Sequence, residues 1–274
     1  MKFKNTKAYN FEGAFRGMRN PMNSWERSDS YFGLVDIYDS DALTDVCEHW
    51  LELENIDDDD NEYYNKLNEY ELWLERNGIL DCDEQGTIYS TVLLGPNDLK
   101  LAQQLIFAGD EHAKFMRQIF VSVDITAPLY WWKEFDTYKI GTVANSTSTM
   151  HKLAAEPITK EMFEFDEPWL VIDKYKITHG GECETVFDDY IDDIIDMCEN
   201  LRLKYKETND RAYWRALIQL LPSAYLQTRT VTLSYANLRN IYFQRRSHRL
   251  LEWHNFCSWI TILPYSQELI MIGE

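Results

Sequence analysis

The chain has 274 residues, 45% of them hydrophobic, so it is long enough to bury a sizeable core. Its formal net charge of -19 argues against long nucleic acid as a partner, because a protein that binds a polyanionic backbone needs a basic face to release counterions. No apolar run approaches the roughly 20 residues that span a bilayer, so no membrane partner is expected.

Cysteine and histidine usage limits the chemistry further. The cysteines are odd in number, show no CxxC spacing and follow no apolar leader, which favours the cytoplasm: Cys47, Cys82, Cys183, Cys198 and Cys257. None lies in an activating motif, and Cys257 sits among apolar residues, so we expect core packing there rather than a nucleophile. The histidines lack HxH and HxxxH spacing, and no metal site is expected.

The first third of the chain is expected to contribute a loop and acidic helices. Residues 11–30, FEGAFRGMRNPMNSWERSDS, mix glycine, proline and amides with aromatic side chains, which favours a structured loop. From Leu43 to Leu80, apolar residues recur at three- and four-residue steps and predict two amphipathic helices. The aspartates 57–60 between them lack the alternating ligands and glycine of a calcium loop and indicate a solvated turn.

The middle of the chain predicts a helix, a strand and another helix. Gly95-Pro96-Asn97 begins a helix with Asn97 as its N-cap, and a shorter helix is expected at 111–116. Residues 118–126 are rich in β-branched side chains and predict a strand, after which Ala127-Pro128 opens the helical run LYWWKEFDTY. Such strand-to-helix junctions are where α/β proteins place ligands.

The remainder of the chain predicts two helices, a strand and a final basic helix. Residues 187–206 and 210–221 carry apolar residues at helical spacing with acids on the other face. Residues 228–235 alternate polar and apolar side chains and predict a strand, and Asn237 can cap a helix that runs to Arg245.

Cations and hydroxyl groups gather in two segments of this otherwise acidic chain. Residues 133–152 combine three lysines and a histidine with six serine and threonine hydroxyls: Lys133, Lys139, Lys152, His151, Thr137, Thr142, Ser146, Thr147, Ser148 and Thr149. Residues 229–249 hold His248 and five arginines: Arg229, Arg239, Arg245, Arg246 and Arg249. Guanidinium, ammonium and hydroxyl groups beside aromatic residues suit a phosphorylated, aromatic ligand.

Each segment also has a purely structural interpretation. The hydroxyls of residues 145–149 can bond their own backbone in a polar loop. The arginines can be surface charges that offset the aspartates of other helices, in pairs that each contribute roughly 0 to 1 kcal/mol. The residues alone leave both alternatives open.

The order and content of the two segments resemble the flavin-dependent thymidylate synthases, the class called ThyX. The first segment is similar in four places: the helix 98–108, the turn 109–112, the strand ending at Ala127-Pro128, and the signature region 137–153. The second is similar in another four: Leu221-Pro222, Tyr225 to Arg229, Asn237-Leu238-Arg239, and the basic helix before Trp253. The similar parts cover about 100 of the 274 residues.

The resemblance implies an α/β (α+β) fold, a mixed central sheet flanked by helices. It further implies a single domain over residues 1–274, with a helical, acidic insertion at about 29–91, and assembly into a homotetramer. The implied cofactor is FAD, with NADPH and methylenetetrahydrofolate as further candidates, and the implied partner is a small nucleotide such as dUMP.

The resemblance also implies roles for individual residues. His112, Asn237 and Arg239 match positions that contact flavin. Arg229 matches an arginine that holds the nucleotide, and the further substrate contacts are Arg249, Thr147 and Asn145. The candidate catalytic residues are Lys139, Tyr138 and Arg246, and the spacing to Trp253 leaves open whether Arg246 or Arg249 is the second nucleotide-binding arginine.

The chain departs from the family where the chemistry is done. Thr137-Tyr138-Lys139 stand in place of Arg-His-Arg, and Thr147 and Thr149 replace a later serine and arginine. Lysine cannot reproduce a bidentate guanidinium fork, and one lost electrostatic contact can cost about 3 kcal/mol of transition-state stabilisation.

Three hypotheses follow from these departures. The first is a divergent flavin enzyme that transfers a one-carbon unit or hydride to a pyrimidine base. The second is a catalytically inactive protein that senses or sequesters a nucleotide. The third is an assembly protein that uses Tyr130 and Trp131-Trp132 as contact residues.

Overall fold

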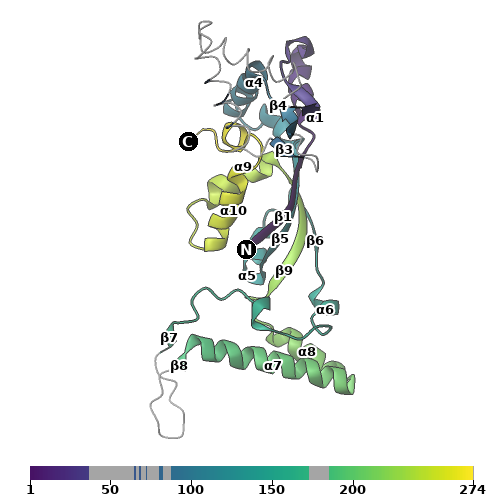
Figure 1. The fold of residues 1–274 in the computed structure, drawn as a ribbon, viewed down its shortest axis with the longest axis vertical. Coiled ribbons are helices and arrows are strands. Elements are labelled where there is room, and N and C mark those ends of the chain that lie inside the picture. The colour runs from purple at the N-terminus through teal and green to yellow at the C-terminus, as the bar shows by residue number, and fades with distance from the viewer. Residues whose placement is uncertain are drawn as a thin grey trace. The chain divides into compact units, whose positions relative to one another are not determined.

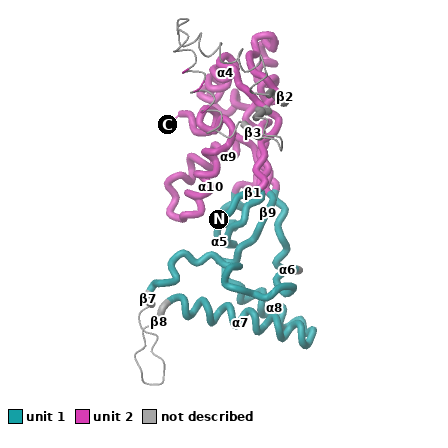
Figure 2. The backbone as a smooth tube through the Cα atoms, in the orientation of Figure 1, with its two compact units in different colours: residues 1–4, 124–137, 144–230 teal, residues 5–123, 138–143, 231–274 magenta. Residues whose placement is uncertain are grey.

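The computed structural model describes residues 1–36, 65, 68, 72, 80–82, 88–172 and 185–273. The chain forms two compact units, shown in different colours in Figure 2. Unit 1 comprises residues 1–4, 124–137 and 144–230, and unit 2 comprises residues 5–123, 138–143 and 231–274. The single domain with a helical insertion that the sequence predicts is not tested by this division and stays a prediction.

A four-stranded sheet has the order β1-β5-β9-β6 (Figure 1). The strands are β1 (Lys2–Tyr9), β5 (Phe120–Pro128), β9 (Leu226–Ser234) and β6 (Val143–Ser146). Each has residues in both units. The strands predicted at 118–126 and 228–235 are confirmed with their ends shifted by one or two residues, whereas β1 and β6 were not predicted.

Unit 2 contains the helices α1 (Phe11–Arg19), α4 (Pro96–Phe107), α9 (Tyr235–Arg245) and α10 (Leu251–Thr261). Unit 2 also contains the short helical turns η1 (Asn20–Met22), η2 (Trp25–Arg27), η3 (Ala113–Arg117) and η5 (Ser266–Ile270). Large aromatic side chains fill the core between these elements, and the ring of Phe11 meets that of Tyr235 edge-on at 5.5 Å.

The loop predicted at 11–30 is wrong for its first half, which is the helix α1. Its apolar residues Phe11, Ala14, Phe15 and Met18 are buried at helical spacing. The glycines that suggested a loop have a packing role: a Cβ on Gly17 would lie 2.7 Å from Oε1 of Gln118. Close approach of a neighbouring side chain, and not a turn, explains glycine here.

The predicted insertion begins and ends in strands. β2 (Tyr31–Asp36), β4 (Ile88–Leu93) and β3 (Leu80–Cys82) form an antiparallel sheet in the order β2-β4-β3. Val35 pairs with Ser90 from one side and Leu80 pairs with it from the other. The two helices predicted between Leu43 and Leu80, and the aspartate turn 57–60, lie almost wholly outside the described residues.

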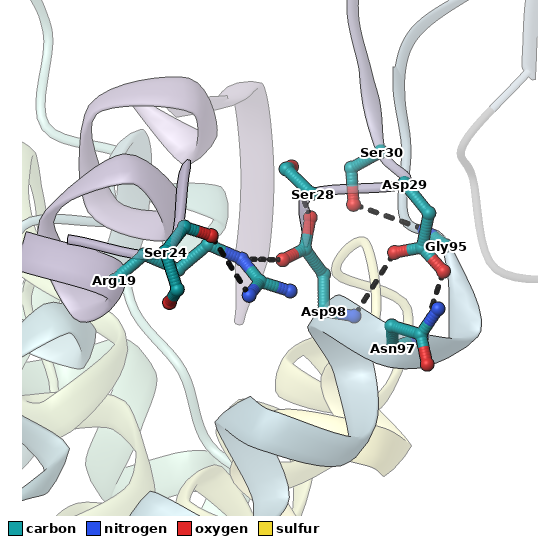
Figure 3. Close-up of polar contacts among 8 residues, drawn as sticks. All are labelled: Arg19, Ser24, Ser28, Asp29, Ser30, Gly95, Asn97 and Asp98. Atoms are coloured by element: carbon teal, nitrogen blue, oxygen red, sulfur yellow. Dashed lines mark hydrogen bonds and ion pairs between the residues drawn. The ribbon is translucent and has the colours of Figure 1, made fainter. Parts of the chain in front are cut away.

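A polar cluster in unit 2 ties α1 to the start of α4 (Figure 3). Nε of Arg19 donates to Oδ1 of Asp98 at 2.6 Å, and Oγ of Ser28 donates to the other carboxylate oxygen at 2.6 Å. Both charged side chains are buried. Because an unpaired buried charge is costly, each of the two depends on the other.

The same cluster caps helix α4 with a residue distant in sequence. Asn97 was predicted as the N-cap, but Gly95 occupies that position and offers no side chain. The carboxylate of Asp29 instead accepts from the backbone N–H groups of Asn97 at 2.8 Å and Asp98 at 3.0 Å. It thereby satisfies two donors that a helix leaves open at its start.

Unit 1 contains α5 (Leu129–Phe135), α6 (Thr149–Lys152), α7 (Phe187–Thr208) and α8 (Arg211–Leu220). It also holds the turn η4 (Lys160–Met162) and the strand pair β7 (Val171–Ile172) and β8 (Thr185–Val186). Helices α7 and α8 confirm the prediction and pack against each other (Figure 1). Their shared apolar cluster includes Ile191, Ile195, Cys198 and Leu217.

Candidate functional site

The residues singled out from the sequence divide between the two units. Arg229, Thr147 and Asn145 belong to unit 1. Unit 2 holds the others: His112, Tyr138, Lys139, Asn237, Arg239, Arg246 and Arg249.

Arg229 of β9 is the centre of the group in unit 1. Its Nη1 pairs with Oδ1 of Asp136 at 2.7 Å, and its Nε donates to Oε1 of Gln227 at 2.9 Å. The guanidinium lies 4.2 Å above the indole of Trp132, which is buried. These contacts hold the group over the indole ring and use two of its five N–H donors, which leaves others for an anionic ligand.

Gln227 links Arg229 to the predicted substrate residue Thr147. Its Nε2 donates to the carbonyl of Thr147 at 2.9 Å. The N–H of Thr147 in turn donates to the carbonyl of Thr228 at 2.9 Å, which joins the chain after β6 to β9. One amide side chain thus positions both the guanidinium and the hydroxyl-bearing segment.

One interpretation of the sequence made residues 145–149 a polar loop, but only part of this run is a loop. Asn145 belongs to the end of β6, and Thr149 begins α6. The side chains of Asn145 and Thr147 are both exposed. These two predicted substrate residues are therefore accessible to a ligand in unit 1.

Tyr138 lies in an aromatic and cationic group of unit 2. Its hydroxyl accepts from Nε of Arg245 at 2.7 Å and donates to Oε1 of Gln244 at 3.0 Å. The Arg245 guanidinium lies 4.5 Å from the centre of the Trp253 ring, and the Tyr138 ring meets Trp253 edge-on at 5.9 Å. Neighbouring Lys139 is exposed. The tyrosine is therefore positioned by α9 and α10, while the lysine is available to a ligand.

Asn237 has a structural role that the sequence did not indicate. It was predicted to cap α9, but Ser234 is the N-cap and Asn237 completes the capping box three residues later. Its Nδ2 also donates to the carbonyl of Ile140 at 2.7 Å. Gly141 has φ +73, and a Cβ there would lie 2.9 Å from Oδ1 of Asn237. Asn237 thus fixes the segment that follows Lys139.

Arg239 and Arg246 share the ring of Phe243, at 4.8 and 5.1 Å from its centre. Nη1 of Arg239 donates to the carbonyls of Ile270 at 2.6 Å and Ile272 at 2.7 Å. Burial lowers the pKa of the Arg239 guanidinium, while the nearby Asp110 carboxylate opposes that shift. A further anion beside this half-buried cation would be stabilised.

His112 and Arg249 are exposed. His112 is the N-cap residue of η3, which packs against α9, so it lies on an element neighbouring Asn237 and Arg239. Arg249 lies in the connection between α9 and α10. The structure therefore brings the three predicted flavin residues onto two packed elements of one unit.

The described residues also bear on metal, thiol and membrane chemistry. No group of three or more histidine, cysteine or acidic side chains in the described part of the chain is arranged to hold a metal ion. Burial raises the pKa of the Cys257 thiol to about 11, which suits core packing and not a nucleophile. None of the helices in the described ranges is long and apolar enough to cross a membrane.

The assembly hypothesis loses the tryptophans proposed as its contact residues. Trp131 and Trp132 are fully buried and form an aromatic cluster with Phe135. Nε1 of Trp132 donates to the carbonyl of Gln227 at 2.9 Å. These tryptophans build the core beneath Arg229 and are not available to a partner.

Sequence reasoning missed the residues that position the cations. Asp136, Gln227 and Trp132 surround Arg229, and Arg245 sits between Tyr138 and Trp253. The alternation of β9 could have indicated Gln227, which is two residues from Arg229 and on the same face. Asp136 and Trp132 come from another segment, and nothing local pairs them with β9.

The strands and helices form a mixed α/β fold. No protein-family model matches the chain, and no curated protein matches it. A solved structure of thymidylate synthase X from Helicobacter pylori with FAD and dUMP is similar over 98% of this chain and 97% of that chain, with a TM-score of 0.54 and 14% identity. This likeness shows that the fold of the chain is of the ThyX type. A second structure, flavin-dependent thymidylate synthase ThyX from Helicobacter pylori complexed with FAD and dUMP, gives a TM-score of 0.44 at 16% identity over 64% of this chain and 83% of that chain.

Proposed function

We propose that this protein binds FAD and a pyrimidine deoxynucleotide of the dUMP type and transfers a one-carbon unit or hydride to the base. The observation that carries the proposal is Arg229, a cation held over the Trp132 ring by Asp136 and Gln227 within a ThyX-type fold. A guanidinium fixed in this way is suited to a phosphate, because its remaining donors are already oriented. Thr147 and Asn145, in the same unit, would add neutral donors.

The residues of unit 2 fit a flavin diphosphate in charge but only partly in hydrogen bonding. Arg239 is a half-buried cation whose nearby acid is Asp110, and His112 is exposed on the packed turn. Asn237 is less suited, because its amide already bonds Ser234 and Ile140. Arg239 and His112 would therefore hold the diphosphate, and Asn237 would act by keeping the segment after Lys139 in place. FAD, when bound, would supply the reducing equivalents.

Lys139 would act on the base. Its exposed ammonium can stabilise negative charge that develops on a uracil carbonyl oxygen, and Arg246 can contribute a second positive charge. Tyr138 is a candidate proton carrier, since its hydroxyl is hydrogen-bonded to both Arg245 and Gln244.

A binding experiment tests the proposal. The purified protein is saturated with FAD, passed over a desalting column and scanned for a flavin absorbance band, and dUMP affinity is then measured by calorimetry. Arg229→Gln should raise the dUMP dissociation constant about tenfold or more, since a charged hydrogen bond is lost. Arg215→Gln, an exposed change on α8, is the matched control and should leave the constant unchanged. An unchanged constant for Arg229→Gln would overturn the role of Arg229.

A nucleotide-binding protein without catalysis is the second candidate. The observation that favours it is the engagement of the signature segment in its own fold: the Thr137 hydroxyl donates to the carbonyl of Glu134 at 2.7 Å, and the Tyr138 hydroxyl has two partners. Nucleotide binding without a retained flavin band, and without turnover in the presence of NADPH and methylenetetrahydrofolate, would favour this candidate.

A further inference from the structure

An exposed phenylalanine ring lies at the end of helix α4 in unit 2. Phe107 is the last residue of α4, and its side chain is 64% exposed. A single exposed apolar side chain needs no explanation by itself. The turn η5 packs against both α4 and α9, however, and the segment that follows η5 brings Phe107 together with Arg239 of α9.

Gly273 shows how close the ring and the cation are. A Cβ on Gly273 would lie 3.3 Å from Cε1 of Phe107 and 3.4 Å from Nη2 of Arg239. The edge of the ring and the edge of the guanidinium therefore approach the same point of the backbone. Gly273 has φ +98, in the left-handed region that favours glycine, so no side chain fills the space beside them.

Arg239 is held in place but keeps donors for an anion. Its Nη1 makes both of its hydrogen bonds to described residues, the carbonyls of Ile270 and Ile272, and its guanidinium lies 4.8 Å from the centre of the Phe243 ring. Nε and Nη2 remain for a ligand, and Nη2 is the nitrogen that approaches Gly273. A phosphate bound through Nη2 would therefore be a neighbour of the exposed ring.

A carboxylate narrows the class of ligand. The chain turns at Gly109, with φ +104, directly after α4, and the exposed side chain of Asp110 follows. Burial lowers the pKa of Arg239, and the Asp110 carboxylate is near enough to oppose that shift. A carboxylate repels a free phosphate but accepts hydrogen bonds from hydroxyl groups, as an acid does from the ribose in dinucleotide-binding proteins. The ligand should therefore carry hydroxyl groups beside its phosphate.

We propose that Phe107, Asp110 and Arg239 form a subsite for the adenosine diphosphate half of FAD. Arg239 binds the diphosphate, Asp110 accepts hydrogen bonds from the ribose hydroxyls, and the adenine ring stacks on Phe107. Adenine is uncharged and has a large π-face, so stacking adds affinity without adding negative charge to a strongly acidic protein. This subsite rests on the proposed function and deepens it, because it favours FAD over FMN, which lacks the adenosine.

Calorimetric titration with FAD, FMN and ADP tests the subsite. Phe107→Leu keeps an apolar side chain but removes the ring, so it should raise the dissociation constants of FAD and ADP about tenfold or more and leave that of FMN unchanged. Phe107→Trp retains a ring and should keep the wild-type constants. Phe120→Leu, the same change at an exposed phenylalanine of β5, is the matched control and should alter none of the three. Circular dichroism checks that the variants remain folded.

The three ligands separate failure of the subsite from failure of the proposed function. FAD bound equally well by the wild type and by Phe107→Leu overturns the subsite and leaves the proposed function in place. Equal weakening of FAD and FMN also overturns the subsite, because Phe107 would then act on the flavin ring. ADP binding that depends on Phe107, without any FAD binding, supports the subsite and overturns the proposed function. A protein that binds neither ADP nor FAD overturns both.

Discussion

Arg19 and Asp98 form a buried ion pair although 79 positions separate them, so no local pattern in the sequence predicts their contact. The main contribution of the pair to stability is that each side chain neutralises the buried charge of the other. Removing one member leaves an uncompensated charge in a medium that solvates it poorly.

Asp98→Ala should therefore lower the free energy of unfolding by about 3 to 5 kcal/mol, measured by urea denaturation. Glu207→Gln, which removes an exposed ion pair on α7, is the control and should cause no measurable change. Replacing both members, Arg19→Met with Asp98→Leu, should cost less than Asp98→Ala alone. If the double variant is the less stable of the two, an unpaired buried charge is not the cause.

A sequence pattern can indicate that a residue takes part in capping a helix without indicating which position of the cap it occupies. The sequence favours Asn237 as the cap of α9, yet its side chain stands at the third position of a capping box and reaches Ile140 across the turn. Asn, Ser and Thr near a helix start can all serve as caps, and only the backbone path decides among them.

At the scale of elements, the pair of Glu199 and Arg202 makes α7 sensitive to acid. Arg202 donates to both carboxylate oxygens, at 2.7 and 2.5 Å, and the N–H of Ile158 adds a third bond at 2.8 Å. The hydrogen bond from Arg202 is the chief reason that the pKa of Glu199 lies below its ordinary value. A carboxylate with a lowered folded pKa stabilises the protein above the unfolded pKa, and that contribution is lost as pH falls through the folded pKa.

Glu199→Gln should therefore destabilise the protein near neutral pH and lose that effect in acid. The measurement is urea denaturation of both proteins at steps from about pH 6 to 3, with the difference in unfolding free energy plotted against pH. The difference should shrink as pH falls. Exposed Glu167→Gln serves as the control, and a difference that stays constant across this range would show that Glu199 acts through packing alone.

Helices with strong apolar periodicity were predictable, and elements defined by distant partners were not. Helices α7 and α8 follow from their spacing, and β5 and β9 from β-branched residues. Strand β6 was not predicted because its four residues, VANS, show no alternation of apolar and polar side chains. Helix α1 was missed because glycine at two positions outweighed the apolar spacing around it, although the glycines pack against Asn10 and Gln118.

At the scale of the whole molecule, the net charge of -19 should oppose an anionic ligand before it reaches any arginine. Raising the salt concentration from about 20 to 200 mM should therefore increase the association rate constant for dUMP, because screening weakens the repulsion. Stopped-flow measurement checks this, with an uncharged nucleoside as the control. A rate that falls with salt would show that local cations, and not the net charge, dominate the approach.

The candidate site shows the same limit as the fold. The sequence indicated Arg229, Arg239 and Lys139 as cations, and their types follow directly from phosphate chemistry. Two of the three residues that hold Arg229, Trp132 and Asp136, come from α5 and its end, far from β9 in the sequence. Contacts between residues distant in the sequence decide which cationic side chains are held in place. Local sequence patterns do not predict such contacts.

The small sheet β2-β4-β3 has a consequence for protein engineering. Val35 and Leu80 pair with the same residue, Ser90, from opposite sides of β4. Strands on either side of a common neighbour lie about 10 Å from each other. The end of β2 and the start of β3 are therefore close together. A foreign domain whose own ends lie about that far apart could be grafted between Asp36 and Leu80 without rethreading any strand.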